Sequence, residues 1–354
     1  MTDDRRTAFH RIARKNGDRA FLTSAWQHHV GHEYGAAEFA GATVDFVKRW
    51  DWDWVKINPR AIYYGEIWDA VYDHEDYDWL VPKTIRPAIQ SASDISRIDV
   101  RDPETNQVLR EQADAARLIR TSLSDRAILD TIFSPLSVLL QLADLPLYPE
   151  GLGSDQNEKD DLTRQELIFD QPDASKEALG RIARTLADFA ALLVTPREQG
   201  GAGLDGIFFA ETGLASHDYF NQEQFEEWAK PYDRIVIQAV RSANPDAVVL
   251  LHTCREEAHP ERFMDLNPDL LHWDQFLPGN PEIDVDFQAV PVGGANFELF
   301  NPGNDTSQIL KELDRTIEAR QGHPFLLAPS CTIPTPADEG ALRVLSQTRA
   351  PIQD

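Results

Sequence analysis

Short runs rich in apolar and β-branched residues recur along the chain, and stretches with a helical period separate most of them. Run 247–251 contains no polar residue, a pattern typical of parallel strands that are covered on both faces. The predicted strands are 20–25, 53–59, 127–133, 206–211, 247–254, 270–274, 290–296 and 324–331. Strands that alternate with helices favour a single α/β (β/α)8 TIM barrel, and a doubly wound sheet is the alternative.

The stretches between the strands carry apolar positions at helical spacing. They predict helices over 7–18, 36–50, 106–123, 176–199, 222–243 and 306–321. Residues 62–82 mix Tyr and Trp with acids, which predicts an aromatic-rich excursion over the barrel rather than a regular element. Residues 151–176 are polar and acidic, and predict an inserted loop or a short helical lid. Because the strand–helix rhythm resumes afterwards, we expect one domain over 1–354, with an N-terminal helical segment at 1–19.

Composition and charge narrow the possible partners. The chain has 354 residues and is 42% hydrophobic, which is enough for one large core. Its net charge of −25 opposes binding to phosphate backbones and anionic lipids, so neither a nucleic acid nor a membrane partner is expected. The sequence contains no apolar run of about 18 residues for a membrane span. The first residues lack the apolar core of a signal peptide, so a cytoplasmic location is expected.

Two predicted strands end in potential metal ligands. His252 and Cys254 are two residues apart at the end of strand 247–254, so both side chains leave the same face. The second of the chain's two cysteines, Cys331, ends strand 324–331. One imidazole and two thiols suit a borderline-soft metal such as zinc, and barrel active sites lie where strands end. The structural alternative is a hydrogen-bonded core histidine with two inert thiols.

Other polar side chains at predicted strand ends are candidates for catalysis or substrate binding. Lys56 and Asn58 alternate onto one face, so both could point into the barrel mouth. Glu211 is the candidate catalytic residue, as a base or a displaceable metal ligand, on condition that Ile207 and Phe209 line the barrel interior. A salt bridge is the structural alternative for this carboxylate. The remaining substrate-binding candidates are Trp26, His28, His29, His272, Asp274 and Asn296.

Several short segments share a pattern with a known superfamily. They are Phe133-Ser134-Pro135-Leu136, Gly206-Ile207-Phe208, Pro231-Tyr232, His252-Thr253-Cys254 and Cys331-Thr332-Ile333-Pro334-Thr335-Pro336. Over nearly its whole length the chain resembles the uroporphyrinogen decarboxylase superfamily, which also implies a barrel.

The resemblance is incomplete for the decarboxylases of that superfamily. They carry an Arg-rich N-terminal loop that holds substrate carboxylates, an early Ser-Asp pair and a late Gly-His-Gly-Ile motif. Here residues 26–29 contain no Arg, strand 53–59 offers Lys56-Ile57-Asn58 in place of the Ser-Asp pair, and Ser330-Cys331-Thr332-Ile333 replaces the late motif. A polycarboxylated tetrapyrrole without an arginine cradle would be bound poorly. Decarboxylation is therefore the alternative rather than the main hypothesis.

Another branch comprises zinc-dependent methyltransferases that work with corrinoid proteins. It is marked by His-x-Cys and a later single Cys, to which His252, Cys254 and Cys331 are similar. The resemblance implies Zn²⁺ on these three residues and methyl transfer between a corrinoid and a thiol or a methylated small molecule, in either direction. Because the chain contains no Asp-x-His-x-x-Gly cobalamin signature, a separate partner protein is expected to supply the corrinoid. A metal-free binding protein on the same scaffold is a further alternative.

Overall fold

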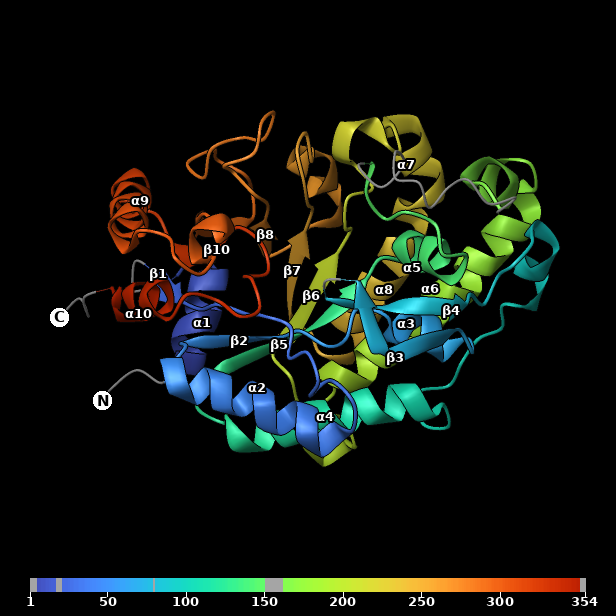
Figure 1. Ribbon diagram of the computed structural model, residues 1–354, viewed down its shortest axis with the longest axis horizontal. Coiled ribbons are helices and arrows are strands. Elements are labelled where there is room, and N and C mark those ends of the chain that lie inside the picture. The colour runs from blue at the N-terminus through green and yellow to red at the C-terminus, as the bar shows by residue number, and fades with distance from the viewer. Residues whose placement is uncertain (1–4, 17–20, 79, 150–161, 351–354) are drawn as a thin grey trace.

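The computed structural model describes residues 5–16, 21–78, 80–149 and 162–350, and shows eight parallel strands surrounded by helices (Figure 1). The strands are β1 Phe21–Thr23, β2 Trp54–Ile57, β5 Ala127–Phe133, β6 Gly206–Ala210, β7 Val248–His252, β8 Leu270–His272, β9 Val290–Ala295 and β10 Phe325–Pro329. Their hydrogen-bonded order is β1-β10-β9-β8-β7-β6-β5-β2. Every predicted strand is confirmed. The sheet curls into a nearly closed (β/α)8 barrel, so the doubly wound alternative is wrong.

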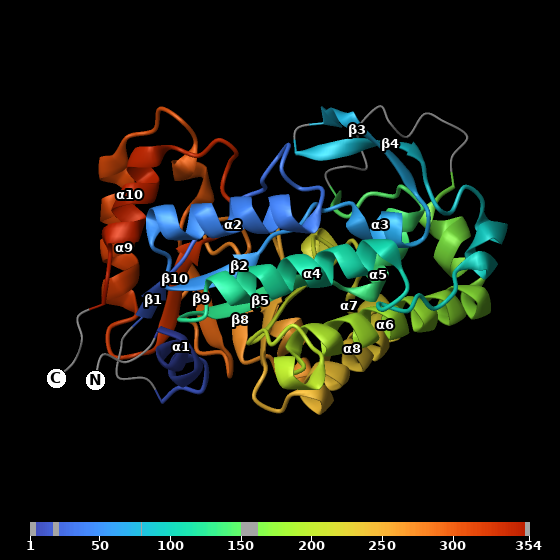
Figure 2. The ribbon, with the colours of Figure 1, turned by 90° about the horizontal axis from the view of Figure 1, so that it is seen from below.

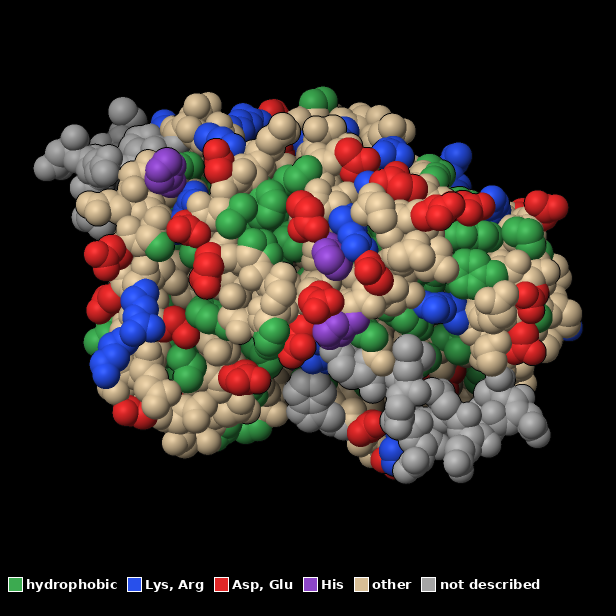
Figure 3. Space-filling view, turned by 90° about the horizontal axis from the view of Figure 1, so that it is seen from above, with side chains coloured by type: hydrophobic (Ala, Val, Ile, Leu, Met, Phe, Trp, Pro, Cys, Tyr) green, Lys and Arg blue, Asp and Glu red, His purple; other side chains and the backbone are tan. Residues whose placement is uncertain are grey.

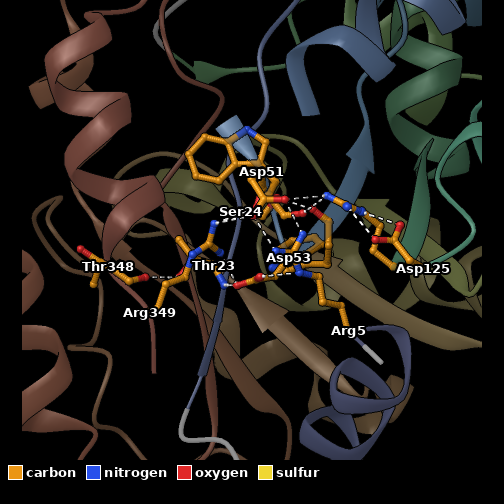
Figure 4. A network of polar contacts seen from close by, with 11 residues as sticks. Arg5, Thr23, Ser24, Asp51, Asp53, Asp125, Thr348 and Arg349 are labelled. Carbon is orange, nitrogen blue, oxygen red and sulfur yellow. Dashed lines mark hydrogen bonds and ion pairs between the residues drawn. The ribbon is translucent and has the colours of Figure 1, made fainter. Parts of the chain in front are cut away.

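Backbone and side-chain hydrogen bonds, together with ion pairs, join β1 to β2, where the barrel closes (Figure 4). The Asp53 amide donates to the Thr23 carbonyl at 2.9 Å, and the Thr23 amide donates to Asp53 Oδ2 at 2.9 Å. Ser24 Oγ donates to the Trp54 carbonyl at 2.7 Å. Arg349 lies 2.6 Å from the Asp53 carboxylate and Arg5 lies 3.3 Å from it. The seam therefore ties residues from both ends of the described chain to the first two strands.

Alternation along the strands separates two hydrophobic layers. Trp54 and Phe208 belong to the cluster inside the barrel, whereas Val55 and Ile207 pack outward against the helices. Helix α1, Arg5–Ala13, overlaps the helix predicted over 7–18 and adds Phe9 to the inner cluster. It therefore covers the N-terminal end of the barrel, as Figure 2 shows.

The outer helices largely follow the predicted periodicity. They are α2 Ala36–Trp50, α4 Gln107–Ser122, α5 Pro135–Leu142, α6 Pro172–Val194, α7 Gln222–Trp228, α8 Lys230–Ala243, α9 Thr306–Ala319 and α10 Glu339–Gln347. The single helix predicted over 222–243 is wrong, because the chain breaks at Ala229 into α7 and α8. Pro231 lies in the first turn of α8, where its missing amide hydrogen does no harm, and it could not continue α7.

Short 3-10 helices connect several of these elements. They cover Ala92–Arg97, Arg197–Gln199, Ser216–Asp218, Pro260–Leu266 and Phe297–Phe300. No helix within the described residues is long and apolar enough to cross a membrane.

Two excursions from the barrel differ from expectation. Residues 62–82, predicted to lack regular structure, contain α3 Tyr63–Ile67 and β3 Val71–Asp78, which forms a hairpin with β4 Val81–Arg86. Most of the hairpin is exposed, so its sequence lacks the apolar alternation that marks a half-buried strand. Of the predicted lid at 151–176, residues 151–161 lie outside the described residues. The rest is a single turn of π-helix, Gln165–Phe169, followed by the start of α6.

Candidate functional site

Two thiols meet at the C-terminal mouth of the barrel. His252 is the last residue of β7 and Cys254 follows it, whereas Cys331 comes two residues after the end of β10. β8 and β9 separate these two strands, so the side chains can meet only over the mouth. The two sulfur atoms lie 3.9 Å apart. Two sulfurs on one tetrahedral zinc, each at about 2.3 Å, would lie roughly 3.8 Å apart, so the spacing fits a shared zinc ion.

The two thiols have different acidities. The hydrogen bond with Cys331, together with burial, raises the pKa of Cys254 well above its usual value. The same hydrogen bond lowers the pKa of Cys331, which outweighs the effect of burial. The pKa of Cys331 therefore lies below that of Cys254. A metal that bound both sulfurs would displace any thiol proton, since the thiolate is the ligand.

Hydrogen bonds assign the tautomers of two neighbouring histidines, His252 and His272, whose ring centroids lie 4.7 Å apart. His272 Nε2 lies 2.9 Å from the Pro329 carbonyl, so it carries the hydrogen and leaves a lone pair on Nδ1. His252 Nδ1 lies 2.8 Å from His272 Nδ1 and 3.3 Å from the His272 carbonyl oxygen, so His252 Nδ1 is the donor. Burial lowers the pKa of His272 to about 4 and that of His252 well below its usual value, so both rings are neutral. Nε2 of His252 then carries the free lone pair that a metal requires.

These groups fit zinc by their chemistry and by the spacing of the thiols. Among the described residues, no three His, Cys, Asp or Glu side chains lie close enough together to hold a metal ion as they stand. Asp274, after β8, contributes a buried carboxylate beside both thiols, where its charge raises both thiol pKa values. Burial raises the pKa of Asp274 itself, although hydrogen bonds from the Phe276 amide and Ser330 act to lower it.

A lysine lies inside the barrel next to these residues. Lys56, on β2, donates to Asn58 Oδ1, and both side chains are more than nine-tenths buried. Lys56 Nζ lies 4.4 Å from the ring centre of Phe208 and 5.4 Å from that of Trp26. The Trp26 ring in turn contacts the His272 ring edge-on, with centroids 5.3 Å apart. The structure thus brings together four of the predicted substrate-binding residues: Trp26, Lys56, Asn58 and His272.

Other predicted site residues point elsewhere. The ring of His29 contacts the rings of Phe39 and Phe46 on α2, and burial lowers its pKa to about 4. His28 Nδ1 lies 3.5 Å from Glu33. Asn296 accepts a hydrogen bond from the Glu298 amide at 3.0 Å and caps a short helix. These three side chains have local structural partners in the described chain.

Glu211 does not face the thiols. Its placement at the mouth depended on Ile207 and Phe209 lining the interior, but both belong to the outer cluster. Glu211 leaves β6 on that outer side, where Ser134 and Asp233 of α8 lie beside its fully buried carboxyl group. Burial is the main reason that its pKa rises to about 7. A direct role for Glu211 in the chemistry remains an untested prediction, and this position does not support it.

Comparison with known proteins assigns the family. Residues 71–350 match the family model described as Uroporphyrinogen decarboxylase (URO-D). The chain belongs to the uroporphyrinogen decarboxylase family. A protein from Chloroherpeton thalassium named uroporphyrinogen decarboxylase is 31% identical over 170 residues, which cover 48% of this chain and 42% of that protein. A second protein of that name, from Chlorobium phaeobacteroides, is 25% identical over 50% of this chain and 45% of its own. The chain thus spans under half the length of these relatives.

Solved structures support the same fold. A methyltransferase from Methanosarcina mazei has a TM-score of 0.68 and 16% identity, with 97% of each chain covered. A B12-independent methionine synthase from Shewanella sp. W3-18-1 has a TM-score of 0.52 and 12% identity, over 93% of this chain and 94% of that one. At such identities the likeness establishes the barrel fold only.

Sequence reasoning missed two groups at the mouth of the barrel. Phe208 lies between Lys56 and the two histidine rings, with centroids 5.2 Å from His252 and 5.8 Å from His272. The Pro329 carbonyl orients His272. The correct phase of alternation along β6 would have found Phe208. A backbone carbonyl leaves no signal in the sequence.

Proposed function

We propose that the protein is a zinc-dependent methyltransferase that moves a methyl group between a corrinoid and a thiol or a methylated small molecule. The observation that carries the proposal is the 3.9 Å spacing of Cys254 and Cys331 at the barrel mouth. His252, with its Nε2 lone pair, would supply the third ligand. Bound zinc would supply Lewis-acid activation of a thiol or of the methyl donor. A separate partner protein would supply the corrinoid.

The protein's own residues would prepare this site. The Pro329 carbonyl orients His272, and His272 fixes the tautomer of His252, as partners behind metal-binding histidines do. The aromatic rings of Trp26 and Phe208 exclude water from the space beneath the mouth. Exclusion of water strengthens electrostatic interactions in the site. Seen from the side toward which β6 and β7 point, the outer surface carries scattered acidic side chains with apolar and histidine side chains among them (Figure 3).

Tetrapyrrole decarboxylation is the alternative, and the names of the family and of the sequence relatives favour it. The structure gives less support to this reaction. Residues 26–29 contain no Arg, and the inner wall offers a buried lysine with an amide rather than paired guanidinium groups. Several carboxylates on one substrate call for the bidentate partners that Arg supplies.

The test is zinc-dependent consumption of methylcobalamin with a small thiol acceptor, followed by the change in corrinoid absorbance. We expect the zinc-loaded protein to turn over, and Cys331→Ala to fall to the background rate while its circular dichroism spectrum is unchanged. Equal rates with and without zinc, or full activity in Cys331→Ala, would contradict the proposal. Release of CO₂ from uroporphyrinogen by the same preparation would favour the decarboxylase.

A further inference from the structure

Unused hydrogen-bond donors gather inside the barrel at Lys56 and Asn58. An ammonium group has three N–H donors and no acceptor, and Lys56 spends one donor on Asn58 Oδ1. This hydrogen bond to Oδ1 turns Asn58 Nδ2 away from the amine. Asn58 Nδ2 is buried and has no hydrogen-bond partner. The pair thus offers donors from two side chains that are 6% and 7% exposed.

No carboxylate of the described chain forms an ion pair with Lys56. Asp130 acts on its charge from the neighbouring strand β5, but Asp130 lies on the alternate side of that strand, next to Ile128 and Ile132 of the outer cluster. Within the barrel the amine faces the rings of Phe208 and Trp26. Burial lowers the pKa of Lys56 to about 7, although the charges of Cys331 and Asp130 act to raise it. A buried charge without a partner is costly, so this arrangement favours a ligand that brings a negative charge.

We propose that Lys56 and Asn58 form a subsite for a single carboxylate group of the small-molecule substrate. This proposal rests on the proposed function, since it names the class of methyl acceptor or methylated donor. A carboxylate supplies one negative charge and two planar oxygens, one for Lys56 Nζ and one for Asn58 Nδ2. A phosphate group would bring up to two charges and a third oxygen against one lysine. A neutral amide would leave the lysine charge uncompensated.

The position of the subsite fits a bifunctional substrate. The charge of Lys56 lowers the pKa values of His252 and His272, and the charge of Cys331 raises the pKa of Lys56, so Lys56 lies within electrostatic reach of the candidate metal ligands. A short molecule with a sulfur at one end and a carboxylate at the other would span from the thiols to Lys56. The subsite would orient the sulfur for methyl transfer.

The experiment measures binding of 3-(methylthio)propionate and its neutral isostere 3-(methylthio)propanamide to zinc-loaded protein by calorimetry. We expect the wild type to prefer the carboxylate by about 10-fold or more, as a charge-assisted hydrogen bond allows. Lys56→Met should erase this preference while zinc content stays unchanged. Lys48→Met is the matched control, because it removes the same charge from an exposed position on α2 and should keep the preference.

Asn58→Leu provides a second variant that leaves Lys56 in place, and it should weaken the preference without abolishing it. The subsite is disproved if the wild type binds both compounds equally, or if Lys56→Met retains the preference. These experiments measure ligand binding rather than methyl transfer, so they test the carboxylate subsite separately from the methyltransferase activity. A carboxylate preference without any methyl transfer would leave the subsite intact and overturn the methyltransferase alone.

Discussion

Neighbouring side chains at the mouth have different pKa shifts because burial and hydrogen bonding act on them unequally. The hydrogen bond between the two thiols raises the pKa of Cys254 and lowers that of Cys331. His252 and His272 stay neutral because the rings are buried. The result is a set of soft, uncharged or singly deprotonated donors, which suits zinc better than it suits a hard cation.

Glu211 and Asp233 form a pair of fully buried carboxyl groups behind the barrel wall. Burial and the neighbouring Glu211 raise the pKa of Asp233 well above its usual value, and that of Glu211 is raised to about 7. A carboxyl group with a raised folded-state pKa binds its proton more tightly in the folded protein. Its contribution to stability is full below the unfolded-state pKa of about 4.3 and is lost as pH rises through about 7.

Glu211→Gln should therefore become stabilising relative to wild type as pH rises from about 5 to about 8, because the amide has no proton to lose. The measurement is the difference in Tm between variant and wild type at each pH. Zinc content should not change, since the side chain points away from the thiols. A Tm difference that is independent of pH would show that the pair does not titrate, and loss of zinc would restore Glu211 to the metal site.

At the scale of elements, α1 completes the inner core of the barrel. Its buried face places Ala8, Phe9 and Ile12 against the strand residues inside, and the Phe9 ring lies 5.8 Å from that of Trp54. Arg6 and His10 of the same helix contact the buried Asp205 carboxylate before β6, at 2.6 and 2.9 Å. The helix is therefore held by apolar contact and by charge.

Phe9→Ala should lower the free energy of unfolding by about 3–5 kcal/mol, as expected for a fully buried aromatic side chain. Thr7→Ala, on the exposed side of α1, is the control and should change it by less than about 0.5 kcal/mol. Urea denaturation of both variants measures the difference. Equal stability of the two would mean that α1 is not part of the cooperative core.

For the whole molecule, the positions of the strands were predictable because parallel strands covered on both faces read as apolar runs. The same property hides which side chains of each strand point into the barrel. Along Gly206–Ala210 every residue is buried, so no polar residue shows which face points inward. The condition for Glu211, that Ile207 and Phe209 line the interior, is not met. The proposed ligand residues His252, Cys254 and Cys331 stood out in the sequence by their chemical type and their positions at strand ends. The contact of His272 with His252 arises from the register of the neighbouring strands β7 and β8, and the partnerless Nδ2 of Asn58 depends on what surrounds it inside the barrel, so no local pattern encodes either one.

The central claim is that His252, Cys254 and Cys331 hold a zinc ion, and metal content tests it most directly. Elemental analysis of the purified protein should find about one zinc per chain, and X-ray absorption should show two sulfurs at about 2.3 Å and a nitrogen at about 2.0–2.1 Å. His252→Ala should lose the metal, whereas His323→Ala, at an exposed histidine, should keep it. Native protein without zinc and with both thiols freely titratable, or full zinc retention in His252→Ala, would contradict the account.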